Sequence, residues 1–120
     1  MTKPVAFIIE DDPKLNNIAL ITLQADFEIE TFIDGNAAMQ RLDQFAPQLV
    51  ILDLNLPGTS GREILNKIRG SERFVHTRVI LTTADERQAE TLTEEADIVL
   101  LKPVSPGQLR ELALRIKPAP

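Results

Sequence analysis

The sequence contains no cysteine, tryptophan or tyrosine, and its only aromatic residues are five phenylalanines. Without cysteine, the chain cannot form disulfide bonds, use a thiol as a nucleophile or bind a metal through thiolates. Basic residues are also in the minority, with 13 lysines and arginines against 18 aspartates and glutamates and a net charge of −5. Because binding to phosphates requires a basic surface, this balance argues against non-specific binding to nucleic acid.

Long apolar runs are also missing, so the sequence holds no candidate membrane span. The first apolar run leads within a few residues into three acidic side chains, which is not the pattern of a signal peptide. We therefore expect a cytoplasmic protein that makes no membrane contact. The chain has 120 residues, 43% of them hydrophobic and 26% charged, which suits one globular domain. We assign residues 1–117 to this domain and residues 118–120 to a tail or the start of a linker.

Five strand-like segments alternate with five segments of helical periodicity. Four of the strands are short apolar runs bounded by turn residues, which is typical of strands buried on both faces. The other one, residues 27–32, alternates apolar and polar side chains and predicts an edge strand. A third helix is expected to end near Gly70. The four apolar strands are residues 4–9, 49–52, 79–81 and 98–101, and the other four helices are residues 14–25, 36–45, 85–96 and 105–116.

The periodicity also predicts which helix faces are buried. The first helix carries a wide apolar stripe, formed by Leu15, Ile18, Ala19, Thr22 and Leu23. The fourth helix has a weak apolar face, so we expect it to be the least stable element. Residues 71–78 are expected to form a polar loop in which His76, the only histidine, is solvated.

Alternating strands and helices of this kind predict an α/β fold, (βα)5, with a parallel sheet covered by helices on both faces. Because parallel strands end at the same edge of the sheet, the polar residues that follow them should converge there. Asp12-Pro13 fits the start of a helix, which leaves the two preceding acids free for a cation. The residues expected to converge are Glu10, Asp11, Asp53, Thr83 and Lys102.

Several carboxylates without histidine or thiol favour a hard cation, and Mg²⁺ in particular. A lysine and a hydroxyl beside them complete the groups that phosphoryl transfer requires. An aspartate can itself be the nucleophile and form an acyl phosphate. A metal-activated hydrolase remains a minor alternative, since the chain offers no second domain or lid to shape a substrate pocket.

The whole chain resembles the receiver domains of two-component response regulators. The resemblance rests on the acidic cluster after the first strand, the Asp-Leu-x-Leu-Pro-Gly segment at Asp53, Thr83-Ala84 and Lys102-Pro103. It implies a flavodoxin-like fold with strand order 2-1-3-4-5 and a cis peptide at Lys102-Pro103. It also implies phosphorylation of Asp53 by a sensor histidine kinase or phosphotransfer protein, and signalling to a downstream effector domain or protein.

The resemblance further implies the role of each site residue. Mg²⁺ would be held by Asp11, Asp53 and the backbone carbonyl of Asn55, with Glu10 acting through water. Thr83 would bond a phosphoryl oxygen, and Lys102 would pair with the phosphate. Such a domain is not an enzyme towards other substrates, because it catalyses only its own aspartyl phosphorylation and dephosphorylation. We expect a monomer or weak homodimer.

The chain departs from the family pattern where the signal would be read out. Val99 stands where an aromatic residue is usual, Val104 replaces a frequent phenylalanine, and the segment between Thr83 and Lys102 is about three residues short. These departures leave open an alternative, a receiver-like binding module that does not depend on phosphorylation. A phosphatase of the dehalogenase type is disfavoured, since it would need aspartate where Asn55 stands.

Overall fold

The structure, a computed structural model, describes residues 3–117 as five parallel strands that alternate with five α-helices. The proposed tail, residues 118–120, lies outside the described residues. The strands are β1 (Val5–Ile9), β2 (Glu28–Phe32), β3 (Leu49–Asp53), β4 (Arg78–Thr83) and β5 (Ile98–Leu101). The helices are α1 (Pro13–Leu23), α2 (Gly35–Gln44), α3 (Gly61–Arg69), α4 (Glu86–Leu92) and α5 (Pro106–Ile116), with a short 3-10 helix at Glu72–Phe74.

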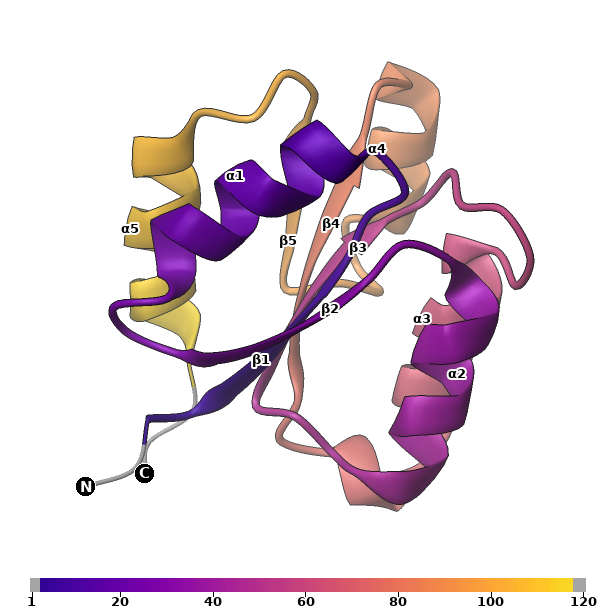
Figure 1. The fold of residues 1–120 in the computed structure, drawn as a ribbon. Coiled ribbons are helices and arrows are strands. Elements are labelled where there is room, and N and C mark those ends of the chain that lie inside the picture. Colours follow the sequence, from indigo (N-terminus) through magenta and orange to yellow (C-terminus); the bar gives the residue numbers. More distant parts are fainter. Residues whose placement is uncertain (1–2, 118–120) are drawn as a thin grey trace.

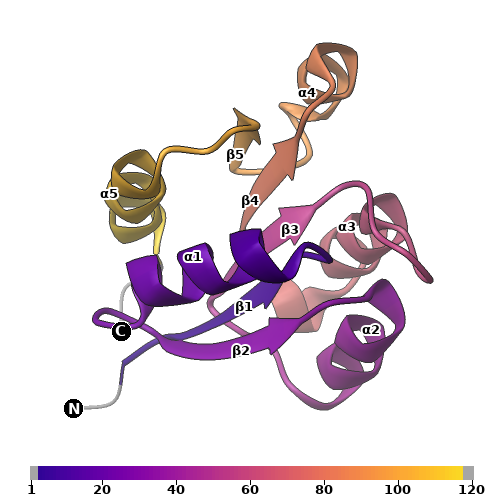
Figure 2. The same cartoon turned by 45° about the horizontal axis from the view of Figure 1, so that its top comes forward.

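The strands form one sheet in the order β2-β1-β3-β4-β5, as the sequence predicts. All neighbouring strands are parallel, and β2 and β5 are the two edges. Helices α1 and α5 lie side by side on one face, and α2 and α3 lie together on the other (Figures 1 and 2). Within the described part of the chain, no helix has the length and apolar character that a membrane crossing requires.

Each face of the sheet carries its own hydrophobic core, because successive strand side chains point to opposite faces. Along β1, Phe7 and Ile9 belong to the core under α2, α3 and α4, whereas Ala6 and Ile8 belong to the core under α1 and α5. All five residues of β3 are buried, which explains its unbroken apolar sequence. The most buried strand therefore delivers Asp53 to the middle of the sheet edge.

The helix starts follow the local sequence closely. Each helix is preceded by a residue whose side chain accepts a hydrogen bond from a backbone N–H of the first turn, which stabilises the helix end. These capping residues are Asp12, Asp34, Ser60, Asp85 and Ser105. Helix α2 was predicted over residues 36–45 but ends at Gln44, since Phe45 has an extended backbone and its half-buried ring stacks on Phe7.

The predicted buried stripe of α1 is wrong for two residues. Leu15 is 39% exposed and Ile18 is 44% exposed, while Ala19 and Leu23 are buried against the sheet. A third buried position is polar, because Asn16 shares the inner face with these two residues. The helix contacts β1 and β2, and Leu15 and Ile18 lie outside the hydrophobic core that contains Ala19 and Leu23.

Two predictions for the second half of the chain also need correction. Helix α4 ends at Leu92 and not at Ala96, which is buried in the turn that follows. Residues 71–78 are not an entirely polar loop, because Phe74 is 1% exposed in the core under α3. His76 is exposed, as predicted.

Candidate functional site

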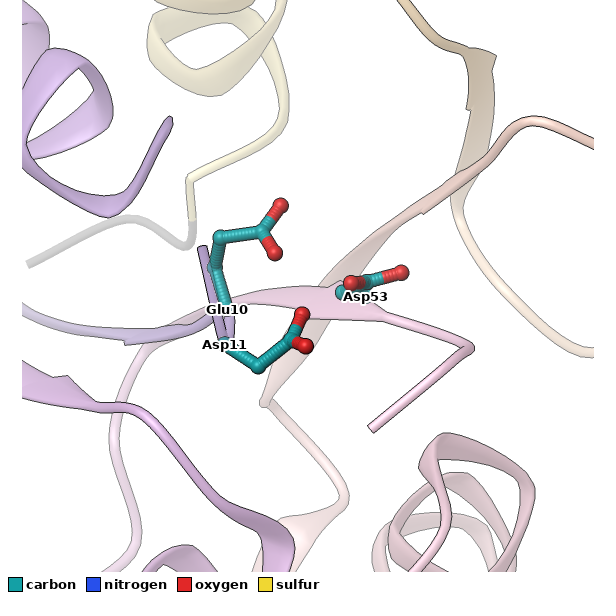
Figure 3. A group of neighbouring side chains, drawn as sticks. All are labelled: Glu10, Asp11 and Asp53. Atoms are coloured by element: carbon teal, nitrogen blue, oxygen red, sulfur yellow. The ribbon is translucent and has the colours of Figure 1, made fainter. Parts of the chain in front are cut away.

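The acidic residues meet at the carboxyl edge of the sheet. β1 and β3 are neighbours with Ile9 opposite Leu52, so the residues that follow them are brought together. Carboxylate oxygens of Glu10, Asp11 and Asp53 lie within 4.8 Å of one another (Figure 3). Glu10 and Asp53 are buried and Asp11 is exposed. The predicted convergence of the three acids is therefore present, and this cluster is able to hold a metal ion.

The turn after β1 is fixed by hydrogen bonds at both ends. Asp12 caps α1 by accepting from the backbone N–H of Lys14 at 2.9 Å, and its own N–H donates to Glu10 Oε2 at 3.2 Å. The buried Asn16 amide donates to the carbonyl oxygens of Glu10 at 3.0 Å and Phe32 at 3.1 Å. Sequence reasoning missed Asn16, although a polar residue on the inner helix face was a signal.

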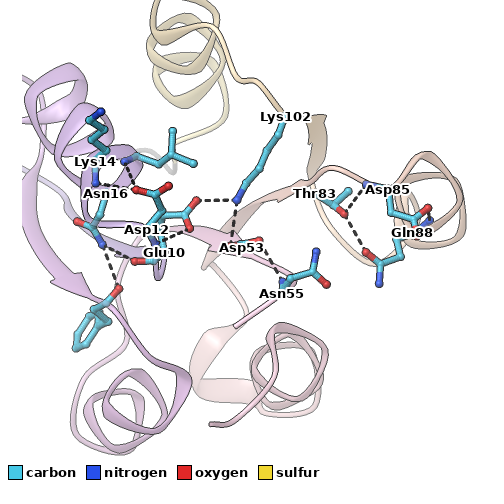
Figure 4. Close-up of polar contacts among 12 residues, drawn as sticks. Glu10, Asp12, Lys14, Asn16, Asp53, Asn55, Thr83, Asp85, Gln88 and Lys102 are labelled. Carbon is cyan, nitrogen blue, oxygen red and sulfur yellow. Dashed lines mark hydrogen bonds and ion pairs between the residues drawn. The ribbon is translucent and has the colours of Figure 1, made fainter. Parts of the chain in front are cut away.

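Lys102 binds both buried carboxylates. Its Nζ lies 2.9 Å from Glu10 Oε1 and 3.1 Å from Asp53 Oδ2 (Figure 4). The Lys102 backbone N–H donates to the carbonyl of Thr83 at 2.8 Å, which ties the end of β5 to the end of β4. The peptide bond between Lys102 and Pro103 is cis, as the resemblance implied.

Burial and the ion pairs act in opposite directions on the protonation of the site. Burial raises the pKa of the Glu10 carboxyl from 4.5 to about 7, and the nearby Asp53 adds to this, while the hydrogen bond from Lys102 opposes it. Burial also lowers the pKa of Lys102, but its hydrogen bonds to Glu10 and Asp53 outweigh this and raise it overall. The site therefore holds more negative charge than one lysine neutralises, which favours a further cation.

The turn after β3 shapes the other side of the site. The backbone N–H of Asn55 donates to Asp53 Oδ1 at 3.1 Å. Gly58 has a φ of 72°, which the Pro57-Gly58 turn requires of its second residue. At Gly61, a Cβ atom would lie 2.5 Å from the carbonyl oxygen of Asp53, so only glycine lets α3 begin this close to β3.

Thr83 reaches the same edge of the sheet, but its hydroxyl faces α4. It is fully buried, donates to Gln88 Oε1 at 2.9 Å and accepts from the Asp85 backbone N–H at 3.1 Å (Figure 4). Thr83 therefore lies at the same sheet edge as the acids, as expected, but its hydroxyl is bonded to Gln88 and Asp85 and not to the acids. Sequence reasoning did not single out Gln88, and no motif marks it.

Comparison with known proteins decides the family. Residues 6–114 match the family model described as the response regulator receiver domain. The chain belongs to this family. The receiver family is one of phosphoaccepting domains of two-component systems, so a phosphorylation-independent binding module is not favoured.

Curated relatives include transcription regulators and a kinase. The receiver is 32% identical over 113 residues to the transcriptional regulatory protein TrcR of Mycobacterium tuberculosis, covering 92% of this chain and 42% of that protein. It is 34% identical over 118 residues to BaeR of Escherichia coli, covering 95% of this chain and 47% of that protein. A match of 31% identity to the sensor histidine kinase TmoS of Ectopseudomonas mendocina covers 90% of this chain and 11% of the kinase. The receiver thus spans less than half the length of these three relatives.

Solved structures agree with the fold. The BeF3-activated receiver domain of DrrB superposes with a TM-score of 0.85 at 28% identity, covering 96% of this chain and 97% of that one. CheY4 of Vibrio cholerae, a chemotaxis response regulator, also gives a TM-score of 0.85, at 25% identity and 96% and 99% coverage.

An apolar pocket of about 320 Å³ borders the acidic site of the receiver on its α1 and α5 side. The exposed Leu15 and Ile18 line it from α1, and Val104 and Leu109 line it from the segment after β5 and from α5. Glu10 and Lys102 contribute its polar part. Leu15 and Ile18 are therefore exposed because they line this pocket and belong to neither hydrophobic core.

Proposed function

We propose that this receiver accepts a phosphoryl group on Asp53 in the presence of Mg²⁺. The observation that carries the proposal is a cluster of three carboxylates at the carboxyl edge of β1 and β3, two of which, Glu10 and Asp53, contact Lys102 at the end of β5. A carboxylate at this position acts as the nucleophile, forms a bond to phosphorus and becomes an acyl phosphate. The bond between phosphorus and the donor breaks, and its electron pair leaves with the donor.

The residues present fit a magnesium ion. Asp11, Asp53 and the backbone carbonyl of Asn55 would hold it, with Glu10 as a further acid acting through water. Magnesium would supply positive charge that offsets the charge of the phosphoryl oxygens. The cluster is suited to this ion because it offers only oxygen ligands and combines a buried nucleophile with the exposed Asp11, which keeps one side open to water.

Lys102 and Thr83 would bind the transferred group. Lys102 already contacts Asp53 Oδ2 and can stay paired with a phosphoryl oxygen after the transfer. The Thr83 hydroxyl would donate to another phosphoryl oxygen once it turns towards Asp53. Movement of Thr83 and its loop would then change the surface around α4.

The family supports the proposal of two kinds of partner. The phosphoryl donor is a sensor histidine kinase or a phosphotransfer protein, and the phosphorylated receiver acts on an effector domain or protein. The receiver domain comprises residues 1–117. It works in the cytoplasm as a monomer or weak homodimer. It turns over no other substrate, because the only group that it phosphorylates and dephosphorylates is its own aspartate.

Intact mass spectrometry after incubation with acetyl phosphate tests the proposal. We expect one added phosphoryl group, which requires Mg²⁺ and is lost in Asp53→Asn. Asp43→Asn, an exposed residue on α2, is the matched control and should accept the group as the parent does. The proposal would be contradicted if the folded parent gains no phosphoryl group, or if Asp53→Asn gains as much of it as the parent does.

A further inference from the structure

The hydrogen bonds of Thr83 show what must change before it contacts a phosphoryl group. A threonine hydroxyl carries one proton and two acceptor lone pairs. In this structure the proton is donated to Gln88 Oε1, and one lone pair accepts from the Asp85 backbone N–H. Because the only proton is in use, Thr83 cannot donate to a group on Asp53 while it remains bound to Gln88.

Of its two partners, Gln88 alone competes for this proton. The Asp85 N–H needs only a lone pair, which the hydroxyl keeps when it donates elsewhere. Gln88 is half-buried in α4, whose seven residues enter the core through Leu92. On the neighbouring strand, Val99 pairs with Leu81 and has an apolar side chain that offers Thr83 no hydrogen bond.

We propose that Gln88 is a positioning residue that holds Thr83 on the α4 side and thereby lowers the affinity of the site for a phosphoryl group. This inference rests on the proposed phosphorylation of Asp53 and adds the residue that opposes it. Breaking the Thr83–Gln88 hydrogen bond contributes to the free-energy difference between the inactive and the active state of the receiver. Loss of this bond also releases α4 from Thr83 at the third residue of the helix, which links the occupied site to α4.

Two substitutions of similar size should shift the affinity in opposite directions. Gln88→Met removes the strong acceptor and should raise the affinity for beryllofluoride at saturating Mg²⁺ by roughly 2- to 10-fold, the factor of one net hydrogen bond. Gln88→Glu offers a charged acceptor, which binds the hydroxyl more strongly, and should lower this affinity. Mg²⁺ affinity without beryllofluoride should stay unchanged in both, and Gln40→Met on the exposed side of α2 is the control.

Calorimetry is the suitable measurement, since the chain has no tryptophan or tyrosine to report binding by fluorescence. In a Thr83→Val background the effect of Gln88→Met on this affinity should vanish, because Thr83→Val has already removed the hydrogen bond that the two residues share. The four proteins form a double-mutant cycle that measures this coupling. A readout without ligand is the NMR signal of the Thr83 methyl group. In metal-free Gln88→Met it should shift towards its position in the beryllofluoride complex.

The outcomes separate the two proposals. A parent that binds no beryllofluoride would contradict phosphorylation at Asp53 and the role of Gln88 with it. If the parent binds beryllofluoride but Gln88→Met changes neither the affinity nor the chemical shift of the Thr83 methyl group, only the role of Gln88 is overturned. That role is also overturned if Gln88→Met has the same effect on affinity in the parent and in Thr83→Val.

Discussion

At the scale of single residues, the site is a balance between burial and charge. Glu10 and Asp53 are removed from water, and each is held by the same lysine. A buried ion pair of this kind contributes little net stability, because the desolvation of the charges offsets their attraction. Its value lies in holding the Asp53 carboxylate in a fixed position, which the proposed role of Asp53 as a nucleophile requires.

The pKa of Glu10 predicts a pH dependence of stability in the metal-free protein. Its pKa in the folded state, about 7, lies above the ordinary value of 4.5. Between these two pH values the folded state binds more protons than the unfolded state, so this residue makes stability fall as the pH rises. Glu10→Gln should flatten that fall, as measured by urea unfolding followed by circular dichroism in a chelator. Glu28→Gln on the exposed part of β2 is the control that should keep the slope of the parent, and an unchanged slope in Glu10→Gln would contradict this account.

At the scale of elements, α1 shows how two apolar residues of one helix acquire different roles. Leu23 is fully buried against the sheet, whereas Ile18 lies beside the apolar pocket and keeps 44% of its surface exposed. Both are in the same helix and both are large and aliphatic. The contributions of the two side chains to stability should therefore differ because Leu23 is more deeply buried than Ile18.

Alanine substitutions in α1 test this difference. Leu23→Ala should lower the free energy of unfolding by about 2–5 kcal/mol, the cost of a cavity in a packed core. Ile18→Ala should lower it by less than Leu23→Ala does, by about 1 kcal/mol, since less buried surface is lost. Urea unfolding of both variants gives the two values directly. Equal losses would mean that Ile18 is covered in solution.

The elements also show what sequence can predict. Caps, apolar runs and turn residues are local signals, and they placed the five strands and nearly all helix starts correctly. Periodicity shows which residues share a face but not how much of that face a neighbour covers, so Leu15 and Ile18 were wrongly expected to be buried. The depth of Phe74 and the early end of α4 likewise depend on packing between distant segments.

At the scale of the whole molecule, the parallel sheet converts a linear order of motifs into one site. The acids follow β1 and β3, and the lysine follows β5, so they meet only because these strands point the same way. That meeting follows from the sequence, because (βα)5 topology requires it. The orientation of the Thr83 side chain towards Gln88 does not follow from the sequence, because a side-chain rotamer depends on the residues of α4 that pack around it.

The central claim is that this assembled site phosphorylates itself on one aspartate. Reductive trapping tests it most directly, because borohydride converts an aspartyl phosphate to homoserine at the residue that carried it. After incubation with acetyl phosphate and Mg²⁺, peptide mapping should find homoserine at position 53, and omission of Mg²⁺ should abolish it. Homoserine at Asp11 or Asp12 in place of Asp53, or none in a protein shown to be folded, would contradict the account.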